Sequence, residues 1–399
     1  MILCKEGKIQ AGFLFCIRLQ TNAFCSIIKE DKEAAMTKKK VVVGMSGGVD
    51  SSVAAYLLKE QGYDVIGVTM QIWQDEDRCH VEENGGCCGV SAVRDASAVA
   101  QTLGIPYYVL NFKDVFRSKV MDYFALSYYQ GRTPNPCIAC NRYVKWQSML
   151  QKALSLGADF IATGHYAQVV QLPDGRYTLR KADHGKDQTY ALYNLTQEQL
   201  ARTLMPLGKY TKVQVRAIAE SIGLPVANKP DSQEICFVED RDYAGFLTKY
   251  TGREAEPGHF VDTKGHVLGN HRGIIHYTIG QRKGLGIAMG RPMFVVEIRP
   301  ETREVVLGED QDCFSPGLLA DDCNWMLLSD LAVGQTVKAM GKIRYSHEAA
   351  PCTIVRRGDG LVECRFEEKQ RAITPGQAAV WYRDGYILGG GCVLQRIHA

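Results

Sequence analysis

The stretch Val41-Val42-Val43-Gly44-Met45-Ser46-Gly47-Gly48-Val49-Asp50-Ser51-Ser52 decides the fold of this 399-residue chain. Its apolar run, 41–45, predicts a short buried strand, and the Ser-Gly-Gly that follows predicts a tight turn. A helix is predicted next, because apolar residues recur at helical spacing: Val53, Ala54, Leu57 and Leu58. At such a junction the backbone N–H groups of the loop and of the helix start point outward, which suits a phosphate or pyrophosphate.

The same alternation of strand and helix continues downstream of this loop. Buried strands are predicted at 64–70, 106–110 and 159–163. Two amphipathic helices are predicted between these strands, at 92–103 and at 146–154, because the apolar residues of each range lie on one helical face. Strands and helices in this order predict an α/β domain, a parallel sheet covered on both faces.

The pattern changes after about residue 225, which predicts further domains. Residues 257–290 are rich in Gly, and the C-terminal part alternates between apolar and polar residues with turn signals between the runs. Val337, Ala339, Ile343 and Tyr345 share one parity, and so do Val362, Cys364 and Phe366. We therefore expect an α/β domain at 36–225, a small central domain at 226–305 and an antiparallel β-barrel at 306–399.

Composition excludes several classes of protein. The apolar fraction of 46% and charged fraction of 23% are those of a globular chain with a substantial core. A net charge of +3 excludes a polybasic tail, so any RNA surface must be local. The 14 cysteines are spread along a long chain, unlike those of a secreted disulfide scaffold. No run is long enough to span a membrane, and we expect a cytoplasmic protein.

Residues 1–35 stand apart from this organisation. Their one apolar run is interrupted by Arg18 and Gln20, and no small-residue cleavage site follows, so a secretory signal is not expected. Acidic residues also make a transit peptide a poor fit. We expect 1–35 to be an extension, disordered or the product of an upstream start codon.

The phosphate loop on its own allows two interpretations. A Gly-Gly pair between strand and helix can simply be a turn with a Ser or Asp cap. The full string is more specific, since Ser46 and Ser51 add hydroxyl donors and Asp50 could reach a Mg²⁺ ion. It has neither the Lys-Ser/Thr of a Walker loop nor the glycine spacing of a dinucleotide fold.

Ser46 to Ser52 resembles the loop of the ATP pyrophosphatase (PP-loop) superfamily, whose members cleave ATP between the α- and β-phosphates. Further strings narrow the resemblance to the tRNA-specific 2-thiouridylases: Gly-Arg-Thr-Pro-Asn-Pro-Cys at 131–137 with Cys-Asn at 140–141, Ala-Thr-Gly-His-Tyr at 162–166, Lys-Asp-Gln at 186–188, Asp-Ser-Gln-Glu-Ile-Cys-Phe at 231–237 and His-Tyr-Thr-Ile-Gly-Gln-Arg at 276–282. The match runs in order from about residue 38 to the C-terminus.

The resemblance assigns residues to two binding sites. It implies an ATP site formed by Gly44, Met45, Ser46, Gly47, Gly48, Val49, Asp50, Ser51, Met70 and Gly164. It implies contacts with the target base or the rest of the tRNA from Asn135, Pro136, Cys137, His165, Lys186, Asp187, Gln188, Arg344, Tyr345 and Gln377. Arg beside Tyr is a pairing that suits unstacked bases.

The cysteines at 137, 140 and 236 carry the remaining chemistry. From the residues alone, Cys137-x-x-Cys140 could be a redox pair, half of a zinc site or an accidental spacing. The resemblance implies that Cys236 takes sulfur as a persulfide and that Cys140 is its catalytic partner, able to form a disulfide with it. Many family members carry Asp where this chain has Cys137, so a proton-transfer role there is in doubt. Three cysteines could instead hold a [4Fe–4S] cluster, a second hypothesis.

The other cysteines are expected to be structural. Cys79, Cys87 and Cys88 surround a Gly-Gly loop without regular zinc spacing, and we interpret them as small packing residues. Five more fall in the predicted β-barrel and are expected in its core: Cys313, Cys323, Cys352, Cys364 and Cys392.

The resemblance implies an ATP-dependent sulfurtransferase that adenylates C2 of the wobble uridine of tRNA and replaces its oxygen with sulfur. ATP with Mg²⁺ would be used, tRNA would be the partner, and a cysteine desulfurase or a sulfur-relay protein would donate sulfur. Two alternatives share the fold. One is an amide- or C–N-forming ligase, although no glutaminase motif is present, and the other is a non-catalytic tRNA-binding protein.

Overall fold

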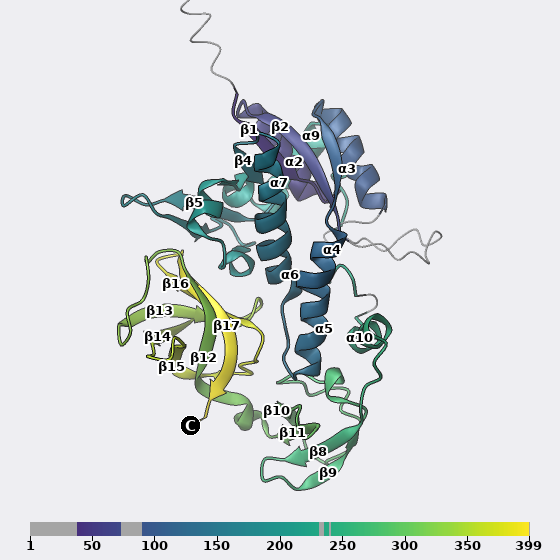
Figure 1. Ribbon diagram of the computed structural model, residues 1–399, viewed down its shortest axis with the longest axis vertical. Coiled ribbons are helices and arrows are strands. Elements are labelled where there is room, and N and C mark those ends of the chain that lie inside the picture. The colour runs from purple at the N-terminus through teal and green to yellow at the C-terminus, as the bar shows by residue number, and fades with distance from the viewer. Residues whose placement is uncertain (1–37, 73–89, 231–234, 239–240, 399) are drawn as a thin grey trace, which may run out of the picture. The chain divides into compact units, whose positions relative to one another are not determined.

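The computed structural model describes residues 38–72, 90–230, 235–238 and 241–398. Its strands form three sheets, and contacts within Lys40–Ala399 join them into one unit (Figure 1). The expected extension at 1–35 and the cysteines Cys79, Cys87 and Cys88 lie outside the described residues. In the described part of the chain, no helix is both long and apolar enough to cross a membrane.

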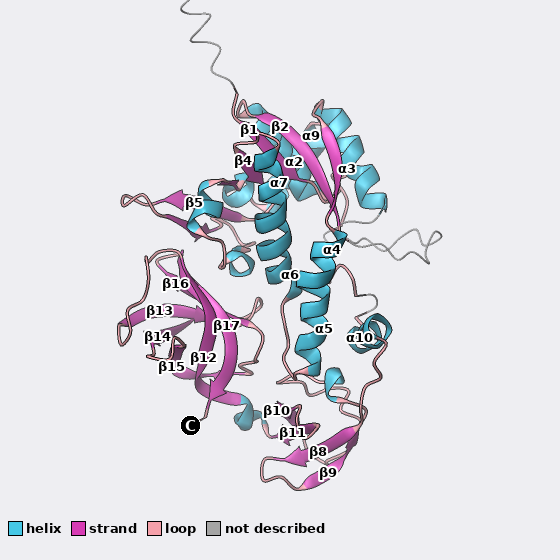
Figure 2. Cartoon of the chain, viewed as in Figure 1, coloured by secondary structure: helices cyan, strands magenta, loops and turns pink. Residues whose placement is uncertain are grey.

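The first sheet is parallel throughout, as the alternation of strands and helices predicts (Figure 2). Its strands, in spatial order, are β3 (Tyr107–Asn111), β2 (Asp64–Gln71), β1 (Lys40–Gly44), β4 (Phe160–Ala162) and β7 (Thr203–Leu204). Strand β1 lies in the middle, with β2 on one side and β4 on the other. The loops that follow β1 and β4 therefore emerge side by side at the carboxyl edge, where open α/β sheets bind ligands.

Alternate residues of β1 face opposite layers of helices. Val41 and Val43 are buried in a core with α2 (Val49–Glu60), α3 (Val90–Leu103) and α9 (Lys212–Ser221). Val42 points the other way, into a core that includes Trp146 and Met149. The sheet is therefore covered on both faces, which confirms the predicted α/β architecture.

Two helical segments extend from this second layer. One is formed by α4 (Lys113–Phe116), η1 (Arg117–Met121) and α5 (Asp122–Tyr129). The other, which carries two of the candidate cysteines, is formed by α6 (Pro136–Ala139), the π-helical η2 (Cys140–Met149) and α7 (Leu150–Ser155). The remaining helices are η3 (Thr189–Leu192), α8 (Gln197–Ala201), η4 (Pro206–Lys209), α10 (Tyr243–Thr251), η5 (Ile274–His276) and η6 (Asp310–Cys313).

The second sheet is small and mixed. Its spatial order is β10 (Phe294–Arg299), β11 (Glu304–Gly308), β8 (Gly258–Asp262) and β9 (Val267–His271). The β11–β8 pair is parallel and the other two pairs are antiparallel. Val261, Val296 and Val306 form its own small core.

The third sheet closes into the predicted antiparallel β-barrel. Its strands, in spatial order, are β12 (Phe314–Trp325), β15 (Val362–Arg371), β14 (Ala350–Arg356), β13 (Thr336–Lys342), β16 (Ala378–Arg383) and β17 (Tyr386–Ile397). Strand β12 pairs with both β15 and β17, which closes the ring. The hairpin of β5 (Ala167–Gln171) and β6 (Tyr177–Lys181) joins β17 through the pair Arg180 and Tyr386.

Two expectations for the barrel were wrong in detail. Strand β13 ends at Lys342, so the alternation does not continue to Tyr345, whose side chain is 49% exposed. Cys313, Cys352 and Cys364 are buried as predicted, whereas Cys323 and Cys392 are only half-buried. Both half-buried cysteines lie beside an irregular part of β12, where the inside–outside alternation of the strand is broken.

Candidate functional site

The loop between β1 and α2 is built around a glycine in the left-handed region. Gly47 has φ +66°, and a Cβ there would lie 2.4 Å from the carbonyl oxygen of Ala92. Ser46 N donates to Ser51 Oγ at 3.1 Å, and Ser51 Oγ donates to Gly48 O at 3.1 Å. Gly48 caps α2 without a side-chain acceptor. No side chain at the N-cap therefore satisfies the N–H groups in the first turn of α2, an arrangement that suits an anion.

The segments that carry Gly164 and Met70 border the same loop. A Cβ on Gly164 would lie 2.6 Å from Ser51 N, so the segment after β4 packs directly on the start of α2. Met70 is half-buried near the end of β2, and the adjacent Thr69 donates its hydroxyl to Met45 O at 2.8 Å. The segments predicted to bind ATP are thus brought together at one edge of the parallel sheet.

The carboxylate of Asp50 contacts two lysines and a phenol. Lys212 Nζ lies 2.7 Å from Oδ1 and Lys186 Nζ lies 3.6 Å from Oδ2, while the Tyr166 hydroxyl donates to Oδ1 at 2.7 Å. Oδ1 therefore has two close partners, whereas Oδ2 faces one ammonium group at 3.6 Å. The negative charge of Asp50 holds two ammonium groups beside the phosphate loop.

A third lysine reaches the loop from further along the chain. Lys229 Nζ donates to Gly47 O at 3.1 Å and pairs with Asp95 at 2.5 Å. Sequence reasoning missed Lys229 and Lys212. Lys212 does carry a signal, because it is the first residue of α9, where the helix dipole disfavours a cation. Lys229 has no comparable local signal.

His165 is held as a neutral imidazole next to this cluster. Burial lowers its pKa well below 6.5, and the charges of Lys145 and Lys186 act in the same direction. Its Nδ1 lies 2.7 Å from Thr163 Oγ1, and its ring packs against Trp146. A neutral histidine can accept or donate a hydrogen bond to a base but adds no positive charge toward phosphate.

The cysteine-bearing helix begins at a well-defined cap. Asn135 is extended, and its Oδ1 accepts from Cys137 N at 3.1 Å, while Pro136 occupies the first helical position. Cys137 is exposed and Cys140 is half-buried. Cys137 therefore lies in the first turn of the helix, and Cys140 begins the turn that follows.

Cys236 is exposed, and the residue after it anchors its segment. The Phe237 ring packs edge-on against Phe116 and Phe124, with ring centroids 5.6 Å and 5.3 Å away. Ile235 and Cys140 pack against the same hydrophobic cluster. The segment carrying Cys236 thus packs on the cluster that also contacts the cysteine-bearing helix.

The barrel contributes a cation and a phenol to the same region. Tyr345 lies 6.3 Å from Tyr190 between ring centroids, and Lys342 Nζ lies 5.7 Å from the Tyr345 ring. Burial raises the pKa of Tyr345, and the charges of Lys186, Asp187 and Cys137 also act on it. Residues predicted to meet the target base, from three distant parts of the sequence, thus lie within electrostatic range of one phenol.

Several other predicted tRNA residues already have partners within the protein. Asp187 accepts from both the backbone and the hydroxyl of Thr189. Gln188 Oε1 accepts from Tyr166 N at 2.9 Å. Arg344 Nη1 donates to Arg371 O at 3.0 Å. These hydrogen bonds hold the loops around the site in place within the protein itself.

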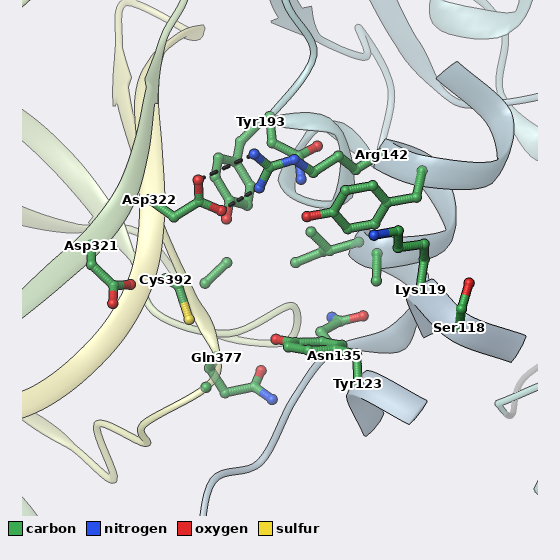
Figure 3. Close-up of a pocket in the computed structure, with 16 residues that line it drawn as sticks. Ser118, Lys119, Tyr123, Asn135, Arg142, Tyr193, Asp321, Asp322, Gln377 and Cys392 are labelled. Carbon is green, nitrogen blue, oxygen red and sulfur yellow. Dashed lines mark hydrogen bonds and ion pairs between the residues drawn. The ribbon is translucent and has the colours of Figure 1, made fainter. Parts of the chain in front are cut away.

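A cavity of about 370 Å³ lies beside the start of the cysteine-bearing helix (Figure 3). Asn135 and Gln377 line it, and Gln377 Nε2 donates to Thr133 O at 2.8 Å. The cavity lies between the helices and barrel strands β12 and β17, whose Asp321, Asp322 and Cys392 complete its wall. Neither Cys137 nor Cys140 lines it.

The donor set does not favour a metal cluster. Within residues 38–72, 90–230, 235–238 and 241–398, no group of three or more His, Cys, Asp or Glu side chains is placed to hold a metal ion. Cys137, Cys140 and Cys236 are among those residues, so the [4Fe–4S] hypothesis is without structural support.

Comparison with known proteins identifies the family to which this sequence is similar. Models described as the tRNA methyl transferase HUP domain, the tRNA methyl transferase PRC-barrel domain and the aminomethyltransferase beta-barrel domain match residues 39–240, 244–309 and 297–393. A tRNA-specific 2-thiouridylase MnmA from Lachnoclostridium phytofermentans is 65% identical over 90% of this chain and 100% of its own. Proteins of the same name from Clostridium perfringens and Acetivibrio thermocellus are each 58% identical, over 90% of this chain and 99% and 100% of theirs.

A solved structure of a 4-thiouridine synthetase with RNA and ATP overlaps 50% of this chain and 45% of its own, at 20% identity and a TM-score of 0.30, too little to add to the argument. The three domain models are described by methyl transfer, whereas the relatives are named for thiolation of uridine. The match to these relatives covers nearly their whole length at 58–65% identity, and we therefore take the family from them. The chain belongs to the tRNA-specific 2-thiouridylase family.

Proposed function

We propose that this chain is an ATP-dependent tRNA-uridine 2-sulfurtransferase, which converts a wobble uridine into 2-thiouridine with release of AMP and pyrophosphate. The observation that carries the proposal is the position of Lys186. Its ammonium group lies 3.6 Å from Asp50 in the phosphate loop, and its charge also acts on Tyr345 on the base side. Lys186 is thus paired with the phosphate loop and acts electrostatically on the phenol that we expect beside the base, the two places that an adenylation step must bring together.

The first step joins uridine to AMP. The C2 oxygen of the extruded uridine attacks the α-phosphate of ATP, the bond to the β-phosphate breaks, and pyrophosphate leaves with the electron pair. The loop N–H groups at Gly47 and Gly48, with Lys186, Lys212 and Lys229 nearby, would stabilise the charge that accumulates on the leaving group. We assign Mg²⁺ to the phosphates of ATP, near Asp50.

The second step replaces oxygen with sulfur. The terminal sulfur of a persulfide on Cys236 attacks C2, and the thiolate of Cys140 attacks Cys236 Sγ, which breaks the S–S bond and leaves its electron pair on the transferred sulfur. AMP then departs with the C2–O electron pair, and a Cys140–Cys236 disulfide remains. An external thiol reduces this disulfide for the next cycle. A soft, ionised sulfur is the nucleophile such a displacement needs.

The partners follow from the same chemistry. A tRNA with a wobble uridine is the substrate, and a base extruded from its stack would be enclosed by Asn135, Cys137 and Tyr345. Sulfur must arrive as a persulfide, from a cysteine desulfurase or a sulfur-relay protein. The exposed position of Cys236 is compatible with direct transfer from such a donor.

The proposal is tested by incubating the chain with labelled ATP, Mg²⁺, a persulfide donor and an unmodified tRNA transcript. AMP formation that requires tRNA, together with thiolated tRNA, supports it. AMP formation that requires an amino acid or a nucleotide acceptor instead of tRNA would indicate a ligase. Tight tRNA binding without AMP would indicate a non-catalytic protein.

A further inference from the structure

Barrel strand β12 has a bulge that faces the cysteine-bearing helix. Asp321 pairs with Cys392 of β17 and Asn324 pairs with Gly390, so Asp322 and Cys323 together oppose the single residue Gly391. Asp322 has φ 45°, in the left-handed region that side chains other than glycine rarely adopt. Bulges of this kind commonly redirect a side chain.

The opposite strand is shaped to accommodate this bulge. A Cβ on Gly391 would lie 2.6 Å from Cys323 Sγ, one on Gly389 would lie 2.5 Å from the Trp325 ring, and one on Gly390 would lie 2.5 Å from the Tyr193 ring. Three consecutive glycines in β17 therefore allow both the bulge and the close approach of Tyr193. The bulge is part of a fitted contact between the barrel and the catalytic domain.

The redirected carboxylate contacts the cysteine-bearing helix. Both oxygens of Asp322 accept from the guanidinium of Arg142, through Nη1 and through Nη2 at 3.2 Å (Figure 3). This contact raises the pKa of Arg142. Arg142 lies in η2, two residues after Cys140.

A second contact from the same bulge reinforces the first. Asn324 Nδ2 donates to the carbonyl oxygens of Tyr193 and Leu195, at 2.8 and 3.0 Å. The segment 322–324 thus binds the catalytic domain at two points. We call Arg142, Asp322 and Asn324 the barrel clamp.

Stability alone does not explain the barrel clamp. Arg142 is 33% exposed and Asp322 is 55% exposed, and ion pairs at that exposure contribute little to folding. An aspartate whose backbone lies in the left-handed region is energetically unfavourable, and this conformation persists only where the surrounding structure requires it. The backbone strain at Asp322 places its carboxylate against the guanidinium of Arg142. We infer that this contact is needed to position the barrel.

We propose that Arg142 and Asp322 are positioning residues, which hold the barrel so that Lys342 and Tyr345 lie against Tyr190 of the catalytic domain before tRNA binds. This inference rests on the proposed function. Tyr345 lies against Tyr190 of the catalytic domain and within electrostatic range of Cys137. The barrel clamp fixes the helix from the barrel side of the cavity, so the two contacts together set the barrel against the helix.

A pre-positioned site has a kinetic signature. The clamp would raise the fraction of molecules that are already arranged to bind tRNA. Without the clamp that fraction falls, and the apparent KM for tRNA rises in proportion. Saturating tRNA restores that arrangement, so kcat changes little. The affinity for ATP stays the same, because the phosphate loop makes none of the clamp contacts.

The test uses the full chain and an unmodified tRNA transcript, with tRNA-dependent AMP formation as the rate. For Asp322→Asn, we expect a KM for tRNA about five- to thirtyfold higher, a kcat within about twofold and an unchanged Kd for ATP. Asp322→Gly should give the same increase, since glycine keeps the bulge but lacks the carboxylate. Arg142→Met should match both, and the Asp322→Asn/Arg142→Met double variant should be no worse than either single variant.

The matched control is the Arg356–Asp330 ion pair. It joins the same residue types at similar exposure, 33% and 63%, but lies wholly within the barrel. Asp330→Asn should leave the KM for tRNA unchanged, and thermal unfolding of every variant identifies any that fails to fold. An unchanged or lower KM in Asp322→Gly, or additive effects in the double variant, would overturn the inference. If the wild type forms no AMP with tRNA, the proposed function fails, and the Kd of each variant for tRNA then decides the clamp alone.

Discussion

Lys186 Nζ lies 3.6 Å from Asp50 Oδ2, so a residue expected to contact tRNA is paired with the phosphate loop. Lys212 reaches the other oxygen of the same carboxylate. The two lysines differ in one respect: the charge of Lys186 also acts on His165 and Tyr345. They are therefore expected to contribute differently to ATP and to tRNA.

Replacing each lysine with methionine separates these contributions. Lys212→Met should weaken ATP binding and lower kcat/KM for ATP by about ten- to a hundredfold, because one cation near the leaving pyrophosphate is lost. Lys186→Met should lower kcat/KM for ATP and for tRNA together. Initial rates of pyrophosphate release measure both, with the exposed Lys338→Met as control. A Lys186→Met enzyme impaired toward tRNA alone would contradict the bridging role.

Gly47→Ala tests the geometry of the phosphate loop. A Cβ there meets the Ala92 carbonyl at 2.4 Å in a left-handed backbone, so the loop must move and ATP affinity should fall more than tenfold. Gly175→Ala is the matched control, because Gly175 has φ +86° but nothing within 4 Å of the added atom. It should cost about 1 kcal/mol of stability and leave ATP binding intact. Calorimetric titration with ATP separates the two effects, and equal ATP affinities for both variants would contradict the steric argument.

The depressed pKa of His165 predicts a pH dependence of stability. An unfolded chain protonates this histidine near pH 6.5, whereas the folded chain keeps it neutral to much lower pH. The unfolded state therefore binds more protons below pH 6.5, and stability is lost as pH falls, by up to about 1.4 kcal/mol per pH unit.

Urea unfolding at pH 7.5 and pH 5.5 measures this loss. His165→Gln should lose less stability between the two pH values than the wild type, since glutamine does not titrate. His271, His276 and His347 also have lowered pKa values and contribute to the pH dependence of both proteins. Equal losses in wild type and variant would show that His165 titrates normally.

Cys140 and Cys236 are both predicted to be required for sulfur transfer. Cys236→Ser and Cys140→Ser should each abolish 2-thiouridine formation while tRNA affinity stays within about threefold, because neither change removes a phosphate contact. Cys392→Ala is the control thiol, since burial raises the pKa of Cys392 to about 11 and keeps it protonated. Nucleoside analysis of the tRNA gives the result, and thiolation retained by Cys236→Ser would remove Cys236 from the sulfur path.

The strongest local patterns predicted most of the fold. The apolar run at 41–45 became β1, and its alternate valines face two layers of helices. The prediction failed at Tyr345, because alternation cannot show where a strand ends, and at Cys323 and Cys392, because a bulge breaks the period of two. Such irregularities depend on contacts with another domain, which leave little local signal.

In the candidate site, too, some residues could be predicted from local sequence and others could not. The glycines and serines of the phosphate loop were predictable because backbone geometry requires those residue types in that order. Lys229 and the Arg142–Asp322 pair were not, since their partners lie 134 and 180 residues away in the sequence. Long-range ion pairs become visible only when the chain is folded.

The most direct test of the central claim is nucleoside analysis of a tRNA transcript after incubation with the chain, ATP, Mg²⁺ and a persulfide donor. We predict 2-thiouridine at the wobble position, with one AMP formed for each sulfur transferred and no product when ATP is omitted. Wobble uridine that stays unmodified while AMP accumulates, or thiolation that proceeds without ATP, would contradict the account.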